Sequence, residues 1–190
     1  MWDYSEKVMD HFRNPRNVGS IEKPDGTATV GSLAGGDALR FQFRLGPDGR
    51  IAEAKFQTFG CASAIASSSA LTEMVIGKTL EEAKKITNKD IADYLGGLPP
   101  QKMHCSVMGR EAMEAAIKNY ETGENADRNL EDEKLCTCYD VSENEVRRVI
   151  AENSLTSVEE VTNFTKAGGG CGRCRPKIQV ILDEINGGAK

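Results

Sequence analysis

The chain ends in a short region that carries two closely spaced cysteine pairs. Cys136 and Cys138 form a C-x-C pair, and Cys171 and Cys174 form a C-x-x-C pair after 32 intervening residues. A region of about 55 residues buries only a thin apolar core, and modules of this size usually depend on a covalent or metal staple. Four thiolates on one metal centre would supply that staple.

Two kinds of metal centre fit four thiolates in two pairs. A two-iron cluster takes two thiolates per iron, and a structural zinc ion takes four in total. A C-x-C pair combined with a C-x-x-C pair is less usual for zinc than two C-x-x-C pairs. The spacing therefore favours an iron–sulfur cluster and leaves zinc open. The glycines at 168–170 and 172 can adopt positive φ and bring backbone N–H groups close to the sulfur atoms.

Two further cysteines, Cys61 and Cys105, stand alone in the longer N-terminal region, each at the expected start of a helix. A helix N-terminus lowers the pKa of a nearby thiol and favours the thiolate. His104 directly precedes Cys105, and Asp37 lies in a glycine-rich loop between two expected strands. Asp37, Cys61, His104 and Cys105 are therefore a candidate four-ligand set for one iron or zinc ion. The alternative is that both cysteines are ordinary buried thiols.

The N-terminal region is predicted to form an α+β domain, a small antiparallel sheet with helices on one side. Alternating side chains predict strands at 38–45 and 51–59, joined by a turn at 46–49 and preceded by a strand at 27–33. Apolar spacing predicts helices at 4–13 and 107–121. A run of small residues without Gly or Pro predicts a helix at 62–75, and a capping box at Thr79 predicts one more.

The C-terminal region is predicted to be a small all-α domain. Capping boxes at Ser142 and Thr156 open two expected helices, and a third begins near Pro176. A polar, charged stretch separates this region from the first and reads as a linker. The expected organisation is a first domain at 1–125, a linker at 126–134 and a second domain at 135–190.

Composition and charge exclude several classes of protein. Hydrophobic residues make up 39% and charged residues 28% of the chain, as in ordinary folded proteins. The net charge of −5 argues against general nucleic-acid binding. No apolar run approaches the ~20 residues of a membrane span, and the first residues lack the pattern of a signal peptide. A cytoplasmic protein is expected, in which six cysteines serve as metal ligands or reactive thiols.

Three segments of the N-terminal region, at 31–39, 58–69 and 98–106, resemble the three motifs of the IscU-type scaffold domain. The C-x-C pair, the 32-residue gap and the Gly-Gly-Gly-Cys-Gly-x-Cys segment resemble a domain similar to bacterioferritin-associated ferredoxin. Together these motifs resemble the NifU family of iron–sulfur cluster assembly proteins, over nearly the whole chain.

The resemblance implies a scaffold that builds a transient cluster from iron and from sulfur delivered by a cysteine desulfurase, and then passes it to apo iron–sulfur proteins. Asp37, Cys61, His104 and Cys105 match scaffold-site positions. The segment 98–102 resembles a recognition motif for an Hsp70-type chaperone. Family members are commonly homodimers. The four C-terminal cysteines match the ligands of a permanent [2Fe-2S] cluster: Cys136, Cys138, Cys171 and Cys174.

The chain departs from the family pattern in two places. Gly35 stands where the family has a cysteine, so the scaffold site is expected to hold a cluster poorly. Many members carry a further domain with its own C-x-x-C pair, whereas this sequence stops at Lys190. We expect either a short member of the family or a truncated chain.

The departure at Gly35 favours an alternative role, electron transfer by the C-terminal cluster in support of assembly. A zinc-stabilised interaction protein is a third reading. We find no pattern typical of an enzyme with its own active site, neither a Ser/His/Asp arrangement nor a Walker-type phosphate loop.

Overall fold

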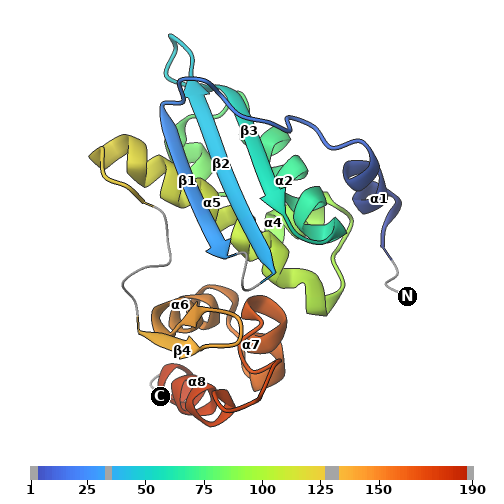
Figure 1. Cartoon of the computed structure of the whole chain (residues 1–190), viewed down its shortest axis with the longest axis vertical. Helices are drawn as coiled ribbons and strands as arrows, with labels where there is room; N and C mark the ends of the chain where they lie inside the picture. The colour runs from blue at the N-terminus through green and yellow to red at the C-terminus, as the bar shows by residue number, and fades with distance from the viewer. Residues whose placement is uncertain (1–3, 33–35, 127–132, 188–190) are drawn as a thin grey trace.

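The computed structural model describes residues 4–32, 36–126 and 133–187. It contains a larger N-terminal module and a smaller C-terminal module that lies against one end of it (Figure 1). The elements of the N-terminal module are α1 (Glu6–Arg13), β1 (Gly26–Ser32), β2 (Asp37–Leu45), β3 (Ile51–Phe59), α2 (Ala62–Val75), α3 (Leu80–Lys84), α4 (Asn88–Tyr94), the 3₁₀ turn η1 (Pro100–Lys102) and α5 (Met103–Thr122).

The three strands form an antiparallel sheet in the order β1-β2-β3. Phe41 and Phe43 on β2 are fully buried, as their alternation in the sequence predicted, and Phe41 pairs with Phe56 on β3. The register shifts once, between Arg44 and Leu45, next to the turn that joins β2 to β3. The predicted hairpin is therefore confirmed.

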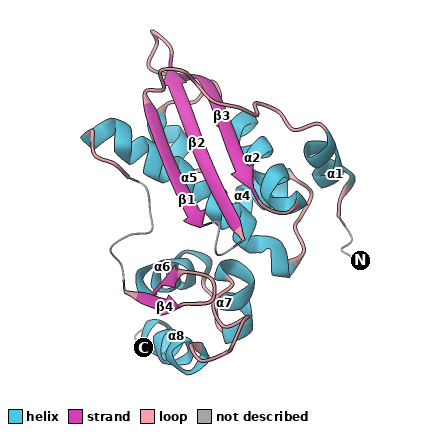
Figure 2. Ribbon diagram, viewed as in Figure 1, coloured by secondary structure: helices cyan, strands magenta, loops and turns pink. Residues whose placement is uncertain are grey.

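The long helices cover one face of the sheet. Helix α5 packs on β1 and β2, and α2 packs on β3 (Figures 1 and 2). Most of α2 is buried, and its many small side chains allow a close approach. The core between sheet and helices contains Leu71, Met113 and Ile117 together with the aromatic residues of β2. The predicted α+β architecture with helices on one side is thus what the structure shows.

Helix α5 begins at Met103 rather than at 107 and ends, as expected, at Gly123, which has φ +71°. Helix α4 was not predicted. Its signal is a capping box in which Thr87 and Asp90 bond each other's backbone N–H groups.

The C-terminal module is helical, as predicted, and adds one short ladder that was not. Its elements are β4 (Lys134–Cys136), β5 (Val141–Ser142), α6 (Glu143–Asn153), α7 (Val158–Thr165) and α8 (Arg175–Gly187). Strands of three and two residues are too short to show alternation. Ser142 caps α6 as expected, whereas the cap of α7 is Ser157 rather than Thr156, with Glu160 completing the box.

The two modules are in contact along α5. Val107 of α5 packs in the apolar core of the C-terminal module and is 5% exposed. Arg110 of α5 binds Glu152 of α6 at 2.7 Å, and Arg148 of α6 pairs with Glu111 of α5. Helix α7 also packs against η1.

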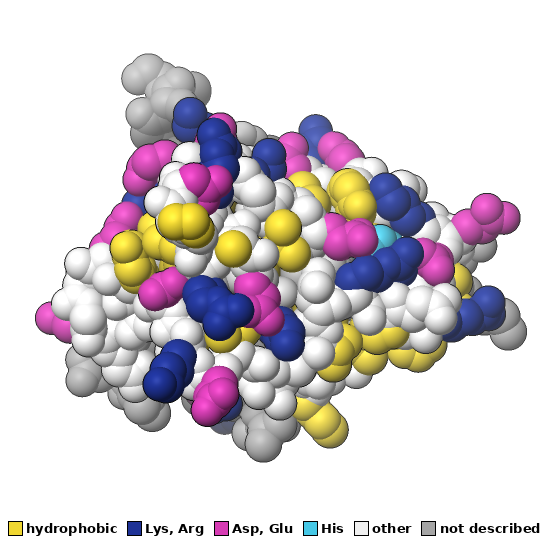
Figure 3. Space-filling view, turned by 90° about the horizontal axis from the view of Figure 1, so that it is seen from above, with side chains coloured by type: hydrophobic (Ala, Val, Ile, Leu, Met, Phe, Trp, Pro, Cys, Tyr) yellow, Lys and Arg dark blue, Asp and Glu magenta, His cyan; other side chains and the backbone are white. Residues whose placement is uncertain are grey.

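On the face seen in Figure 3, basic and acidic side chains alternate with small hydrophobic areas, so this face offers no continuous basic surface. Within the described ranges, every helix is too short or too polar for a membrane span.

Candidate functional site

Three elements bring the predicted scaffold residues to the end of the sheet that faces the C-terminal module. Asp37 opens β2, Cys61 is the N-cap of α2, and His104 and Cys105 lie in the first turn of α5. The start of β2 pairs with the end of β3, because Ala38 lies opposite Phe59, and α2 begins directly after β3. Residues far apart in the sequence therefore meet at one place.

The four side chains form two neighbouring pairs. The Sγ atoms of Cys61 and Cys105 are 3.6 Å apart. The Nε2 atom of His104 is 3.5 Å from Oδ2 of Asp37. Asp37 and Cys105 are buried, and Cys61 is half-buried.

Gly60 permits this arrangement. A Cβ atom at this position would lie 2.5 Å from Oδ1 of Asp37 and 2.9 Å from Cβ of Ala64. Any other residue type would push the carboxylate or the start of α2 away.

The two thiols have opposite pKa shifts. A hydrogen bond from Cys105 is the main cause that lowers the pKa of Cys61 to about 5, and burial opposes it. The backbone N–H of Ala64, in the first turn of α2, also stabilises the Cys61 thiolate, as the predicted helix start implied. The same hydrogen bond and burial raise the pKa of Cys105. The pair therefore shares one proton, and Cys61 carries the negative charge.

Asp37 is ionised as well. Burial acts to raise the pKa of Asp37, but hydrogen bonds from His104 and Lys166 outweigh it and hold the pKa below the usual range. Lys166 ends α7 in the C-terminal module and pairs with Oδ2 of Asp37. No sequence pattern predicted this contact, since 129 positions separate the two residues.

Among the described residues, no group of three or more His, Cys, Asp and Glu side chains is gathered closely enough to hold a metal ion. Gly35 lies outside the described residues. The four-ligand set at Asp37, Cys61, His104 and Cys105 therefore remains a prediction.

The four C-terminal cysteines come from two loops of the C-terminal module. Cys136 ends β4, Cys138 lies in the turn that follows, and Cys171 and Cys174 lie in the loop before α8. All four are free thiols. Each thiol of one pair interacts with a thiol of the other, Cys174 with Cys136 and Cys171 with Cys138.

Backbone and side-chain donors surround these thiols. Nε of Arg173 is 3.3 Å from Sγ of Cys171 and is the main cause that lowers the pKa of Cys171 to about 7. Burial is the main cause that raises the pKa of Cys174, although the backbone N–H of Gly168 bonds to this sulfur. Gly168 has φ +88°, as the glycine-rich sequence suggested.

A Cβ atom on Gly170 would lie 2.9 Å from Cβ and 3.0 Å from Sγ of Cys138. This close approach, the N–H donors and the two cross-pairs of thiols fit a [2Fe-2S] centre, in which each iron takes two thiolates.

Two family models match the chain. Residues 3–127 match the NifU-like N terminal domain, and residues 135–184 match the BFD-like [2Fe-2S] binding domain. The nitrogen fixation protein NifU of Trichormus azollae is 57% identical over 194 residues, which is 97% of this chain and 65% of that protein. The chain spans 60–65% of the length of the NifU relatives it matches.

Further likenesses cover a smaller share of this chain. The iron–sulfur cluster assembly scaffold protein IscU 1 of Archaeoglobus fulgidus is 56% identical over 117 residues, covering 62% of this chain and 76% of that protein. A crystal structure of a putative scaffold protein for the SUF system from Fervidobacterium islandicum superposes with a TM-score of 0.52 at 25% identity, over 60% of this chain and 96% of that one.

Proposed function

The chain belongs to the family of NifU-like proteins, and on that premise we propose that it is a scaffold and carrier for iron–sulfur clusters. The observation that carries this proposal is the meeting of two thiols, an imidazole and a carboxylate at one end of the sheet, with Cys61 and Cys105 3.6 Å apart. Soft thiolates with nitrogen and oxygen donors are the ligand types that iron accepts during assembly.

Cys61 is the residue that we assign to sulfur acceptance. Its thiolate is the nucleophile that attacks the outer sulfur of a persulfide on a cysteine desulfurase. A new S–S bond forms at Cys61 as the S–S bond of the donor breaks, and the donor cysteine leaves as a thiolate. Cys105, with its proton retained at neutral pH, then lies beside the new persulfide.

Asp37 and His104 form the metal-facing half of the scaffold site. With glycine at position 35, the site offers two cysteine sulfurs, one carboxylate and one imidazole in place of the family's three cysteines. We propose that such a site binds iron or zinc and holds a cluster only loosely. Easy release suits a carrier that passes its cargo to apo iron–sulfur proteins.

The C-terminal thiols are proposed to hold a resident [2Fe-2S] cluster, each iron taking one thiolate from each pair: Cys136 with Cys174, and Cys138 with Cys171. Such a cluster supplies one-electron chemistry. Arg173 and the backbone N–H groups of the loop orient the sulfur atoms and stabilise negative charge on them. The arrangement in two pairs supports a two-iron centre over a single zinc ion.

We further propose modules at 1–125 and 135–190 joined by a linker at 126–134, acting in the cytoplasm without enzymatic turnover of their own. The segment 98–102, which contains η1, is the proposed site for an Hsp70-type chaperone. The homodimer that the family resemblance implies is also part of the proposal.

The test is an anaerobic preparation of the full chain, analysed for iron, sulfide and zinc. We expect two irons and two sulfides per chain that Cys171→Ser removes and Cys61→Ser retains. After loading with iron and a desulfurase, the chain should carry additional iron and sulfide at the scaffold site. This additional cluster should transfer rapidly to an apo-ferredoxin, and Cys61→Ser should abolish that transfer. A chain that holds one zinc at the C-terminal thiols contradicts the assignment of the resident cluster.

One observation favours electron transfer as a second function. The C-terminal loop with Cys138 lies beside the scaffold site, because Lys166 contacts both Asp37 and, at 5.9 Å, the ring of Tyr139. Cleavage of a Cys61 persulfide to the thiol and sulfide takes two electrons, which the resident cluster would deliver one at a time and which an external one-electron donor would restore to it. Keeping the resident clusters reduced in this way should then speed release of sulfide. An equal rate with the oxidised cluster would exclude this function.

A further inference from the structure

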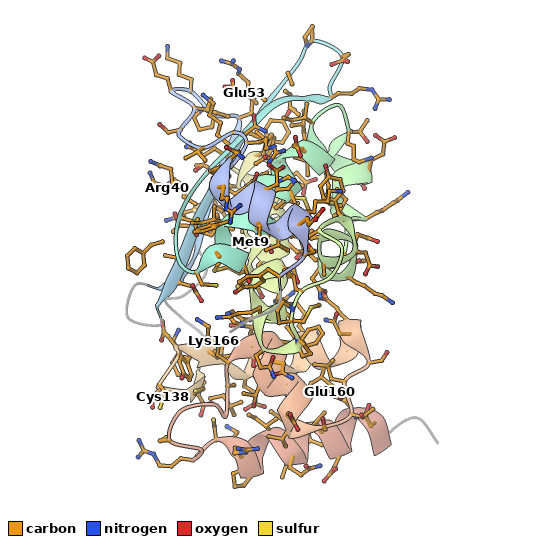
Figure 4. All side chains as sticks on the ribbon, turned by 90° about the vertical axis from the view of Figure 1, so that its right-hand side faces the viewer. Met9, Arg40, Glu53, Cys138, Glu160 and Lys166 are labelled. Carbon is orange, nitrogen blue, oxygen red and sulfur yellow. The ribbon has the colours of Figure 1, made fainter. Side chains whose placement is uncertain are left out.

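We propose that the C-terminal module is a removable cap on the scaffold site, and that Lys166 occupies the side of Asp37 where an incoming metal ion would bind. This inference deepens the proposed function, since it takes Asp37, Cys61, His104 and Cys105 as the receiving site. Lys166 and Cys138 lie on the part of the module that adjoins the end of the sheet (Figure 4).

The first observation is the position of the lysine charge. Lys166 pairs with Oδ2 of Asp37, the same oxygen that His104 approaches at 3.5 Å. A metal ion held by Asp37 and His104 must use this oxygen or its immediate surroundings. An ammonium group and a metal cation beside the same oxygen repel each other, because both are positive, so each weakens the binding of the other.

The second observation is the backbone of Lys166. It is the C-cap of α7 with φ +67°, a left-handed conformation that favours glycine at this position of a helix. A lysine in such a conformation is disfavoured locally. Its long cationic side chain, which reaches Asp37 and faces Tyr139, gives this residue a role that glycine could not fill.

The third observation is that the interface extends beyond this one pair. Val107 is buried in the core of the C-terminal module. Two ion pairs flank it, Arg110 with Glu152 and Arg148 with Glu111. Apolar burial together with several oriented charge pairs defines one docked position. Contacts between surfaces of this kind within one chain are also open to separation.

These contacts describe a closed state in which the ion pair between Lys166 and Asp37 competes with metal. Metal loading must break this pair, and the module then moves or reorients around its remaining contacts. The cap thus couples occupation of the scaffold site to the position of the C-terminal module.

The decisive variant is Lys166→Gly. Glycine is the residue that the left-handed cap prefers, so α7 keeps its end while the charge at Asp37 is lost. Ser154→Gly is the matched control, because Ser154 caps α6 in the same module with φ +51° and is exposed. Lys166→Arg tests whether a cation alone suffices.

The first measurement needs no metal. A zero-length carbodiimide reagent should join Lys166 to Asp37 in the full chain with its resident cluster and no metal added to the scaffold site, as read by peptide mass spectrometry. Hydrogen exchange at η1 and in the first turn of α5 should be slow in the parent chain and in Ser154→Gly, and faster in Lys166→Gly. Absence of the cross-link, or equal exchange in all three proteins, overturns the cap.

The second measurement uses Zn²⁺ as the probe, in the full chain with its resident cluster. The Zn²⁺ concentration that half-protects Cys61 from alkylation should fall about tenfold in Lys166→Gly, the scale of one charge-assisted hydrogen bond. It should stay unchanged in Ser154→Gly and Lys166→Arg. Equal protection in Lys166→Gly and the parent overturns the competition. If Zn²⁺ protects Cys61 in no variant, the receiving site of the proposed function fails, and the competition with it.

Discussion

The sulfur atoms of Cys61 and Cys105 lie 3.6 Å apart, although 44 positions separate the two residues in the chain. One sulfur belongs to the N-cap residue of a helix, and the other is buried in the first turn of another helix. The pair therefore holds one thiolate and one thiol at neutral pH. The two cysteines should therefore differ in their reactivity toward alkylating reagents.

In the apo chain at pH 7, iodoacetamide should modify Cys61 faster than Cys105, because the pKa of Cys61 is about 5 and that of Cys105 is raised. Cys105→Ala removes the main hydrogen-bond donor, so the pKa of Cys61 should rise and its alkylation at pH 6 should slow severalfold. Peptide mass spectrometry follows each cysteine separately. Ser106→Ala, at the neighbouring buried position, is the control, and an unchanged rate in Cys105→Ala would contradict the shared proton.

The sequence predicted most of the elements that build this site, for identifiable reasons. The alternation in β2 and β3 gave the hairpin, and the small-residue helix after Cys61 gave α2 and its N-cap. Other features have weak local signals. Strands β4 and β5 are too short to show a period, and Thr156 and Ser157 are both able to cap α7, since the Glu160 carboxylate bonds the backbone N–H of each.

Tertiary contacts set the remaining features. Nothing near Lys166 in the sequence points to Asp37, because their pairing depends on how the two modules pack against each other. The same holds for Val107, because nothing in the sequence around it indicates that its apolar partners lie in the C-terminal module. Ligand residue types are readable from sequence, whereas the cations that compete for them are not.

Gly170→Ala should cause loss of the resident cluster. The new Cβ would meet Cβ and Sγ of Cys138 at 2.9 and 3.0 Å. Relief of such a contact moves the loop or the thiol, at a cost of about 1–3 kcal/mol. We expect most of the tightly bound iron and sulfide to be lost, as measured on anaerobically purified protein. Gly187→Ala, at a position with open space around it in the same module, should keep the full content. An iron content in Gly170→Ala equal to that of the parent would show that the resident cluster does not require glycine at position 170.

His11 should make the N-terminal module less stable as the pH falls. The ring of His11 is buried and forms a hydrogen bond with Ser69 at 2.8 Å. Burial is the main cause that lowers the pKa of His11. The charges of Arg16 and Lys7 lower this pKa further, and those of Glu73 and Asp10 oppose the shift. Since the folded-state pKa lies below that of the unfolded chain, the unfolded chain binds more protons between the two values.

The stability that neutral His11 contributes is therefore complete above about pH 6.5 and is lost as the pH falls below that value. Urea unfolding at pH 7.5 and pH 5.5 measures the difference. His11→Asn should reduce the loss of stability between these two values, and a loss of the same size in the variant and the parent would argue against His11 as its source.

Arg173 should set the reduction potential of the resident cluster. Its guanidinium lies 3.3 Å from Sγ of Cys171, which is exposed. Reduction adds negative charge to the cluster and its thiolates, and a nearby cation that donates a hydrogen bond stabilises the reduced form. Arg173→Ala should therefore lower the midpoint potential, as measured by a spectroscopic redox titration. Lys177→Ala removes a lysine that is paired with Glu143 at 2.9 Å, and should leave the potential nearly unchanged. Equal shifts in the two variants would mean that general charge, rather than the bond to Cys171, sets the potential.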